Sequence, residues 1–366
     1  MILIFSPQNW GHQFISKHHY AVAFSKKHKT IFFEPTTCTL GKYEIKTFQP
    51  FAENDNLKVV KITLPFPDII RFKANAFFKT INAAAIKKWL KQQTRPAEIL
   101  IDFGCHKAIK DWKFIDCHKK VYFPVDNYEN LPIEKRGCNA FYTVSTNIQE
   151  KFKAACIPMK FMHHGLNHWF AEKAEKRLEE IENGTFNHKS ELVNIAYSGN
   201  LTIPFLDREL ILQLVSTYQD CQFHFFGNNE SNDPAYNEWL HQLKNHANVH
   251  LYGQLAVSEL AKQLFEMDAM LLCYKPDNRN YHAENSHKIN EYLSTGMPLL
   301  TTSISVLKDQ DLYYQLEASN RELNKNAFQD AKEEIVENSR NKMTKRIEYA
   351  LKFRYEVLIN ELLGFN

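Results

Sequence analysis

The sequence predicts an α/β protein whose 366 residues fold into two domains, each built on a parallel β-sheet. Short apolar runs that suit buried strands alternate with stretches of helical periodicity along most of the chain. The chain is also longer than one typical hydrophobic core supports, and its hydrophobic content of 44% is ample for two cores.

The first domain is expected to span residues 1–170 and to begin with a buried strand. Its opening segment, Met1 to Pro7, is apolar but lacks the basic leader and long apolar region of a signal peptide. Later apolar runs end at turn residues and predict further strands, and amphipathic stretches between them predict helices. The predicted strands are 2–6, 30–34, 57–64, 98–102, 119–124, 140–144 and 159–162, and the predicted helices are 13–27, 74–93 and 146–155.

A charged helical linker, 171–191, is expected to end in the turn Asn183-Gly184-Thr185 and to lead into a second domain, 192–340. The same alternation continues there. Helical periodicity from Asn338 to Leu363 predicts a C-terminal helical region, 341–366, with no strand after it. The predicted strands are 192–197, 221–226, 248–251, 268–273 and 298–301, and the predicted helices are 205–218, 234–246, 256–266 and 285–295.

Charge is divided unevenly between the halves. Residues 1–170 hold 25 Lys and Arg against 13 Asp and Glu, a balance of +12, whereas residues 171–366 have a balance of −9. This asymmetry predicts an anionic partner for the first half, such as nucleic acid, an anionic membrane surface or a lipid-linked phosphate. The seven cysteines are odd in number and not tightly spaced, which fits reduced thiols in a cytoplasm. No apolar run approaches the ~20 residues of a membrane span.

The segment Ser286 to Thr302 carries the clearest chemistry. It predicts a short helix that Ser286 can cap, a stop at Gly296, and a buried strand after Pro298. Lys288 lies in the first turn, where the helix dipole is already positive, so an anion is expected there. Glu291 follows one turn later on the same face. A cation for phosphate beside a carboxylate for sugar hydroxyls suits a nucleotide-sugar site, although a solvated Lys/Glu pair is the plainer alternative.

This segment resembles the donor-binding motif of GT-B-fold glycosyltransferases of the glycosyl transferases group 1 (family 4-like) class. The matching residues are Ser286, Lys288, Glu291, Tyr292, Leu293, Gly296 and Pro298. Where many members have a further acid, eight positions before the Glu, this chain has Ala283, and no role is transferred to Glu284. The resemblance implies two Rossmann-like domains facing across a cleft, with a C-terminal helix that crosses back to the first domain.

The resemblance also implies a function and a donor site. Such enzymes move a sugar from a nucleotide sugar to a saccharide or lipid-linked acceptor, and the resemblance implies retention of configuration and a reaction without a metal. The second half resembles the family over nearly its whole length, and bacterial surface polysaccharide or glycolipid assembly is the expected setting. The predicted donor-binding residues are Gly199, Asn200, Arg208, Ser286, His287, Lys288 and Glu291; for Arg208, a structural pairing with Asp207 is the alternative.

The first half offers candidates for the acceptor side. His106 and Asp126 each follow a predicted strand, where side chains of parallel sheets meet substrates, and with Lys288 they form the predicted catalytic set. Asp126 suits a general base or an orienting carboxylate, with a helix N-cap as the alternative. Gly11 and His12 lie on a loop that the family places near both substrates.

Residues 71–95 are basic and aromatic at helical spacing. They suit contact with an anionic membrane beside a lipid-linked acceptor, or a helix whose aromatic face packs on the sheet. We expect the protein in the cytoplasm, either free or peripheral on the inner face of the membrane, with no metal cofactor and no nucleic-acid partner.

Three other functions remain open. A GT-B nucleotide-sugar 2-epimerase would release free nucleotide and make no glycan. A two-lobed sugar-binding protein would not bind nucleotide, and a catalytically inactive partner subunit is consistent with Ala283.

Overall fold

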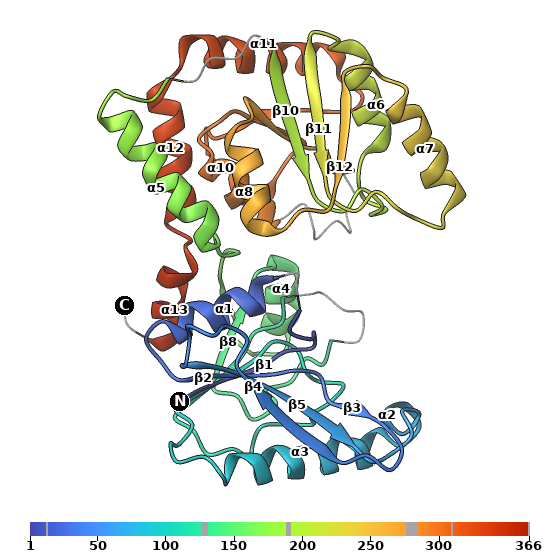
Figure 1. The fold of residues 1–366 in the computed structure, drawn as a ribbon, viewed down its shortest axis with the longest axis vertical. Coiled ribbons are helices and arrows are strands. Elements are labelled where there is room, and N and C mark those ends of the chain that lie inside the picture. Colours follow the sequence, from blue (N-terminus) through green and yellow to red (C-terminus); the bar gives the residue numbers. More distant parts are fainter. Residues whose placement is uncertain (12–13, 126–130, 188–191, 276–284, 309, 365–366) are drawn as a thin grey trace. The chain divides into compact units, whose positions relative to one another are not determined.

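The computed structural model describes residues 1–366 except 12–13, 126–130, 188–191, 276–284, 309 and 365–366. The chain forms two compact units (Figure 1). Unit 1 comprises Met1–His163 together with Tyr355–Asn366, and unit 2 comprises His164–Arg354. The chain therefore leaves unit 1 once and later returns to it, as the predicted C-terminal crossing requires.

Unit 1 is built on a sheet whose strand order is β3-β5-β2-β1-β6-β7-β8-β9, and its paired strands are parallel except where β4 pairs with β5. The strands form where continuous apolar runs are buried on both faces, as in β1. Their bounds are β1 Ile2–Phe5, β2 Thr30–Phe33, β3 Thr37–Cys38, β4 Glu44–Phe48, β5 Leu57–Leu64, β6 Ile99–Asp102, β7 Lys119–Tyr122, β8 Ala140–Thr143 and β9 Lys160–Phe161.

Helices cover both faces of this sheet (Figure 1). Helix α3 (Asn75–Leu90) lies on one face, where its Phe78, Ile86 and Trp89 share a core with Leu3 and Phe5. Helices α1 and α13 lie on the other. The helices of unit 1 are α1 Ser16–Ser25, α2 Ile70–Lys73, α3, α4 Thr146–Ala154 and α13 Tyr355–Leu363.

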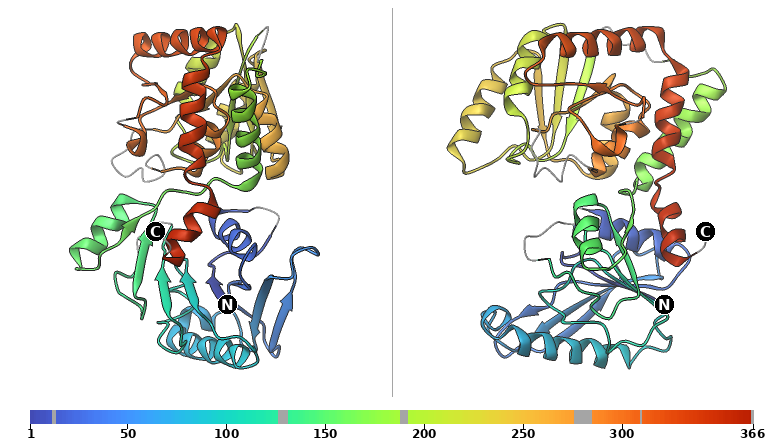
Figure 2. Two further views of the ribbon diagram at one scale, coloured as in Figure 1. Left: turned by 90° about the vertical axis from the view of Figure 1, so that its left-hand side faces the viewer. Right: turned by 180° about the vertical axis from the view of Figure 1, so that it is seen from behind.

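Unit 2 is built on a wholly parallel sheet with the order β12-β11-β10-β13-β14-β15. Its strands are β10 Val193–Ser198, β11 Cys221–Phe226, β12 Val249–Gly253, β13 Ala269–Leu272, β14 Leu299–Thr301 and β15 Tyr314–Gln315. Its helices are α5 His168–Glu182, α6 Arg208–Thr217, α7 Pro234–Lys244, α8 Val257–Phe265, α10 His287–Ser294, α11 Arg321–Glu337 and α12 Arg340–Leu351, with a short 3-10 turn at Ser305–Leu307. Helices α5 and α12 lie side by side in both views of Figure 2.

The expected domain limits need correction. The segment 171–191 is not a linker, because α5 begins at His168 and buries Phe170, Ala174 and Ile181 in the core of unit 2. The region 341–366 is likewise divided: α12 belongs to unit 2, and only the segment from Tyr355 returns to unit 1.

The returning helix α13 is anchored by aromatic rings. The ring of Tyr355 lies 4.8 Å from that of Tyr20 and 5.2 Å from that of His19, both on α1. Lys26 also forms an ion pair with Glu356 at 2.6 Å. The apolar positions of α13 thus complete the face of unit 1 that α1 covers.

Within the residues that the structure describes, we find no helix with the length and apolar character needed to cross a bilayer.

Candidate functional site

Two glycine turns lie next to each other at the carboxyl ends of β10 and β11. Gly199 has φ +138° and Gly227 has φ +142°, conformations that side chains rarely adopt. The Gly199 N–H donates to Phe226 O at 2.7 Å, and a Cβ built on Gly227 would lie only 1.9 Å from Gly199 O. The two backbones therefore touch directly. The Gly199 turn is the one whose residues were predicted to bind the donor.

Lys288 reaches the same turn from the first turn of α10. A Cβ on Gly199 would lie 2.3 Å from Lys288 Cε and 2.9 Å from its Nζ, so the absence of a side chain at Gly199 makes room for the lysine. The buried ammonium donates to the Tyr274 hydroxyl at 3.0 Å. Within the described ranges no acid forms an ion pair with Lys288. Because Lys288 is buried and donates to a hydroxyl group rather than to a carboxylate, a bound anion would supply the opposite charge that it lacks.

Tyr292 fixes α10 against the end of β10. Its hydroxyl accepts a hydrogen bond from Ser198 N at 2.6 Å and lies 3.2 Å from Ser198 O. Burial raises the pKa of Tyr292 well above the ordinary range, so the phenol stays neutral. Tyr292 was predicted only as part of the motif, and its contact shows how the helix is held at the glycine turn.

Glu291 lies on α10 one turn after Lys288. The Asn167 side chain, which also caps α5, donates to Glu291 Oε1 at 3.2 Å. Burial raises the pKa of Glu291 to about 7, against the opposing effects of Lys288 and Asn167. A hydroxyl of a bound ligand would therefore meet a carboxyl group that exchanges its proton near neutral pH.

The start of α10 differs in one respect from the prediction. Ser286 is the N-cap residue, but its side chain forms no capping hydrogen bond, so the predicted side-chain cap is wrong. His287 is exposed at the next position, and its ring lies 6.3 Å from that of His164. Asn290 donates to His164 O at 2.6 Å and secures the helix on its other side.

Asn200 and Arg208 lie further along the Gly199 turn. Asn200 Oδ1 accepts from the N–H of Thr202 and from its hydroxyl, each at 2.9 Å. The Arg208 guanidinium donates to Thr202 O at 3.2 Å and lies 5.2 Å from the Tyr236 ring. Asp207 caps α6 through Leu210 N, so the alternative pairing of Arg208 with Asp207 is not the one observed. Arg208 thus contacts the turn through the carbonyl oxygen of Thr202.

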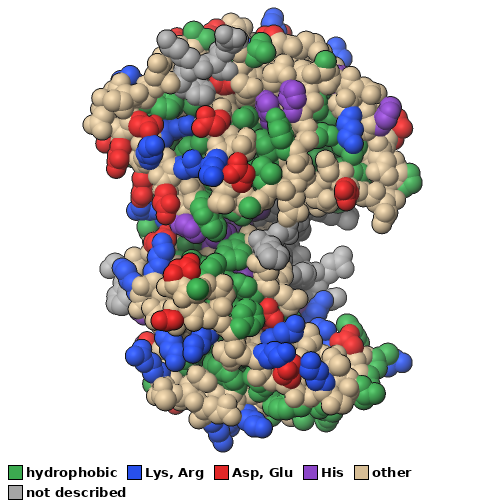
Figure 3. Space-filling model, viewed as in Figure 1, with side chains coloured by type: hydrophobic (Ala, Val, Ile, Leu, Met, Phe, Trp, Pro, Cys, Tyr) green, Lys and Arg blue, Asp and Glu red, His purple; other side chains and the backbone are tan. Residues whose placement is uncertain are grey.

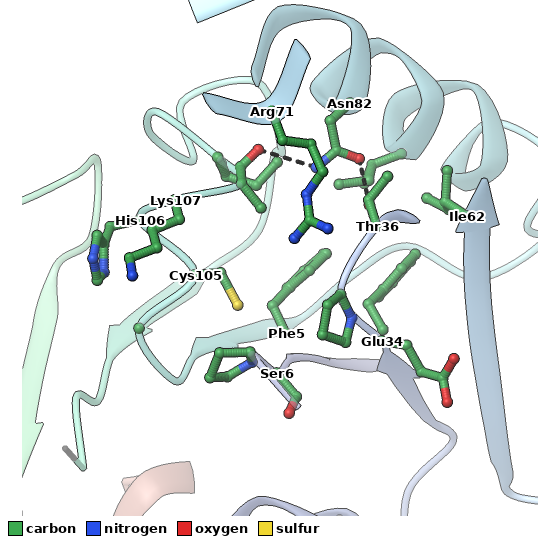
Figure 4. A pocket seen from close by; sticks show the side chains of 17 residues that line it. Phe5, Ser6, Glu34, Thr36, Ile62, Arg71, Asn82, Cys105, His106 and Lys107 are labelled. Atoms are coloured by element: carbon green, nitrogen blue, oxygen red, sulfur yellow. Dashed lines mark hydrogen bonds between the residues drawn. The ribbon is translucent and has the colours of Figure 1, made fainter. Parts of the chain in front are cut away.

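Unit 1 contains a pocket of about 220 Å³ at the carboxyl ends of β1, β2 and β6 (Figure 4). Its floor is apolar, and polar groups surround it. Arg71 extends into the middle, and His106 and Lys107 lie together at one side. The polar lining residues are Ser6, Glu34, Thr36, Arg71, Asn82, His106 and Lys107.

The turn that carries His106 is held by a buried carboxylate that the sequence reading missed. Asp102, at the end of β6, accepts from the N–H groups of Gly104 and Cys105 at 3.0 and 2.7 Å. Its other oxygen accepts from Trp112 Nε1 at 2.7 Å and from Arg136 Nε at 3.3 Å. Burial, then the charge of Arg136, lowers the pKa of His106, so its imidazole is neutral at neutral pH.

Other pocket residues were also missed, because their contacts join distant parts of the chain. Thr36 donates to Asn82 Oδ1 at 2.7 Å, and Asn82 donates to Ala108 O at 3.0 Å. An asparagine on the apolar face of the predicted helix 74–93 was the one available signal.

Two predicted residues, His12 and Asp126, lie outside the described residues. Gly11 is exposed, and a Cβ built there would meet nothing within 4 Å. The structure thus brings Gly199, Lys288 and Glu291 together in unit 2, with Ser286 and His287 on the same helix. It places His106 on the unit 1 pocket.

No protein-family model and no curated protein sequence matches the chain. Solved structures do match it over nearly its full length. An alpha,alpha-trehalose-phosphate synthase (UDP-forming) from Burkholderia xenovorans, in complex with glucose-6-phosphate, has a TM-score of 0.69 at 10% identity, covering 100% of this chain and 99% of that one. HepE from Anabaena, in complex with UDP and glucose, has a TM-score of 0.60 at 11% identity and covers 99% of both chains.

A sucrose-phosphate synthase from Thermosynechococcus elongatus has a TM-score of 0.61 at 10% identity, covering 99% of this chain and 98% of that one. Likeness at such identity establishes architecture. The chain therefore has the GT-B fold, as the resemblance implied, with two Rossmann-like units.

Proposed function

We propose that this protein is a glycosyltransferase that moves a sugar from a nucleotide-sugar donor to a saccharide or lipid-linked acceptor. One observation carries the proposal: the buried ammonium of Lys288 lies against the Gly199 turn, which touches the Gly227 turn, and Glu291 lies one helical turn away. Support comes from the shared fold of solved structures whose titles name UDP, glucose and glucose-6-phosphate.

In the proposed mechanism, unit 2 holds the donor. The diphosphate lies at the paired glycine turns, where N–H groups and Lys288 oppose its charge, and Glu291 accepts hydrogen bonds from the ribose. Negative charge grows on the diphosphate as the bond to the sugar breaks, so Lys288 stabilises the transition state more than the ground state. Asn200, Ser286 and His287 border this site, and Arg208 supports it through Thr202.

Unit 1 supplies the acceptor side. Its pocket combines an apolar floor with Arg71, Lys107 and the neutral imidazole of His106. Sugar hydroxyls pair with such polar groups while the ring covers the apolar floor. Asp126 and His12 keep their predicted roles as residues that contact the acceptor, and Gly11 precedes His12 in the sequence.

We also propose the stereochemistry, the metal independence and the cellular setting of the reaction. The reaction retains configuration, as in the class that the motif resembles. It needs no metal, because Lys288 and the turn amides supply the positive charge. It takes place in the cytoplasm during assembly of a bacterial surface polysaccharide or glycolipid.

A screen of nucleotide sugars by calorimetry, with product analysis of the best ligand, tests the function. We expect one nucleotide sugar to bind and to be hydrolysed slowly without acceptor, at the same rate with EDTA. Lys288→Ala should lose hydrolysis, and Lys262→Ala, which changes an exposed lysine of α8, should keep it. If no nucleotide binds, the proposal fails. Loss of activity in EDTA with recovery in manganese contradicts metal independence, and interconversion of donor epimers identifies the epimerase.

A further inference from the structure

Large apolar side chains gather at one end of unit 1, where solvent reaches them. Leu40 is 75% exposed, Phe72 73%, Ile69 51% and Phe77 49%. We call these four residues the apolar tip. Single exposed apolar residues are ordinary on protein surfaces, but a cluster of this kind marks an interaction site.

Backbone and ring contacts join the tip residues around one short segment, 64–70. The loop that carries Leu40 is bonded to this segment by Thr39 N–H to Leu64 O, at 2.9 Å. The segment continues directly into Ile69 and α2, which carries Phe72. Phe77, in the first turn of α3, contacts the ring of Phe66 at 5.3 Å. The green side chains at the lower right of Figure 3 show this region, near α2 in the matching view of Figure 1.

Basic side chains lie on the same helices as Phe72 and Phe77. Lys73, Lys87 and Lys88 are exposed on α2 and α3, and Lys88 lies 5.4 Å from the ring of Tyr43. The neighbouring acids have cationic partners: Asp68 pairs with Arg71 at 3.0 Å, and Glu44 with Lys46 at 3.1 Å. Unit 1 as a whole holds 25 Lys and Arg against 15 Asp and Glu, whereas unit 2 holds 20 against 27.

The structure also changes which residues suit the membrane contact that was predicted for 71–95. Phe78, Ile86 and Trp89 of α3 are buried against the sheet, so two of the four aromatic residues in 71–95 belong to the core. Lys87 and Lys88 of α3 remain exposed. The exposed apolar side chains are Phe72 and Phe77, which lie within 71–95, together with Ile69 and Leu40, which lie outside it.

We propose that the apolar tip inserts into the interface of an anionic lipid bilayer while the exposed lysines of α2 and α3 bind its head groups. Aromatic and aliphatic side chains flanked by lysine fit the boundary between acyl chains and anionic head groups. An apolar patch on a partner protein would equally cover the tip, but it would not account for a net charge of +10 on this unit and −7 on the other. The pocket shares Arg71 with the tip region, so a lipid-linked acceptor would reach the proposed acceptor site from the same surface.

Sedimentation with phosphatidylcholine vesicles, with and without phosphatidylglycerol, tests the proposal. It requires no donor or turnover, so its outcome is independent of the proposed glycosyl transfer. The full chain should bind the anionic vesicles, and salt should weaken this binding. Ile69→Ser combined with Phe72→Ser should reduce the partition coefficient at least about tenfold. The matched control is Val336→Ser, which changes an 85% exposed side chain on α11 of unit 2 and should bind as wild type does.

A second pair of variants separates charge from insertion. Lys73→Gln, Lys87→Gln and Lys88→Gln together should weaken binding and flatten its salt dependence. Lys244→Gln, Lys325→Gln and Lys345→Gln remove the same charge from exposed positions of unit 2 and should change neither. Circular dichroism and melting temperature confirm that each variant is folded.

Three results would overturn the proposal. These are absence of binding to anionic vesicles at low salt, equal binding to neutral vesicles, and equal binding by the tip variant and its control. Sedimentation velocity without lipid tests whether the tip instead binds a second copy of this chain. A dimer that the tip variant abolishes would assign the tip to that contact and overturn the membrane proposal.

Discussion

At the scale of single residues, the proposed role of Glu291 would couple ligand binding to a proton. Burial raises its pKa to about 7, above the usual range of a glutamate. At neutral pH the carboxyl group is therefore divided between its two forms. In the proposed role, a ribose hydroxyl would donate a hydrogen bond to the ionised form, so a bound nucleotide would stabilise the carboxylate.

We predict that nucleotide affinity rises with pH through this range. At pH 6 most Glu291 is protonated, and the nucleotide must displace that proton, so affinity should improve about tenfold between pH 6 and pH 8. Glu291→Gln should remove this pH dependence and Glu291→Ala should weaken binding at pH 8 by roughly 10- to 150-fold, the range for a lost charged hydrogen bond. Calorimetry at several pH values measures both effects. Unchanged affinity in Glu291→Ala would refute the ribose role.

The same group predicts a pH-dependent change in stability. An acid whose pKa is raised by folding contributes its full stability below the unfolded value and loses it as the pH rises through the folded value. Stability from Glu291 is therefore lost as the pH rises from about 4.5 through about 7. Glu291→Gln should melt at a higher temperature than wild type at pH 8, and the gain should shrink toward pH 5. If the gain in melting temperature of Glu291→Gln grew as the pH fell, the prediction that ionised Glu291 destabilises the fold would be contradicted.

Lys288 should affect turnover more than binding. Its ammonium lies at the Gly199 turn, where leaving-group charge would develop. Lys288→Ala should lower kcat by about 10²–10³-fold, more than Glu291→Ala does, because the interaction strengthens in the transition state. Rates at saturating donor measure this, with Lys262→Ala as the control. A variant with normal kcat and raised KM would make Lys288 a simple binding residue.

At the scale of elements, the close approach of two strand ends shapes the donor side. The backbone of Gly227 touches that of Gly199, whereas Gly253, after β12, has φ +72° and open space where a Cβ would stand. Glycine is thus required at position 227 by both the close contact and the backbone conformation, and at position 253 by the conformation alone.

Gly227→Ala and Gly253→Ala should therefore differ. A Cβ on Gly227 would lie 1.9 Å from a backbone oxygen that cannot move aside, and the strained φ adds to the cost. We expect a loss of at least about 3 kcal/mol in the free energy of unfolding, with nucleotide binding reduced as well. Gly253→Ala should cost about 1–2 kcal/mol and leave binding intact. Denaturant titration and calorimetry compare the two; equal losses would mean that the contact between the turns does not matter.

Elements also show what the sequence could and could not predict. Strands such as Ile2–Phe5 and Val193–Ser198 were predictable because their apolar runs are local signals. Strand β4 was missed because its partly exposed residues are ordered by pairing with β5. Helix α5 was read as a linker because its charges dominate the pattern, although a narrow apolar stripe packs into unit 2.

The candidate site likewise has local features, which the sequence predicted, and long-range contacts, which it could not. The spacing of Lys288 and Glu291 on one helix face is local, and the motif predicted it. The Asn167 contact to Glu291 spans 124 residues, and the Arg136 contact to Asp102 spans 34, so neither has a local signal. Tyr274 was missed because nothing in its neighbourhood shows that its hydroxyl faces Lys288.

At the scale of the whole molecule, unit 1 depends on a segment that follows all of unit 2. Tyr355 is buried against α1, where its ring contacts those of Tyr20 and His19. Tyr355→Ala should cost about 3–5 kcal/mol, the range for a large aromatic side chain removed from a core. Hydrogen exchange should show lost protection in β1 and α1 but not in the strands of unit 2. Tyr252→Ala, at an exposed tyrosine of unit 2, is the control. Equal loss of protection in both units would mean that α13 is not specific to unit 1.

The return of α13 has a consequence for how the protein is made. Chains are synthesised from the N-terminus, and domains usually fold in the order in which they leave the ribosome. Here the strands of unit 1 emerge first, but the helix that covers α1 is translated only after unit 2 is complete. A nascent chain therefore carries an uncovered Tyr20 face throughout the translation of unit 2, and this is the interval in which a chaperone would find a binding surface on it.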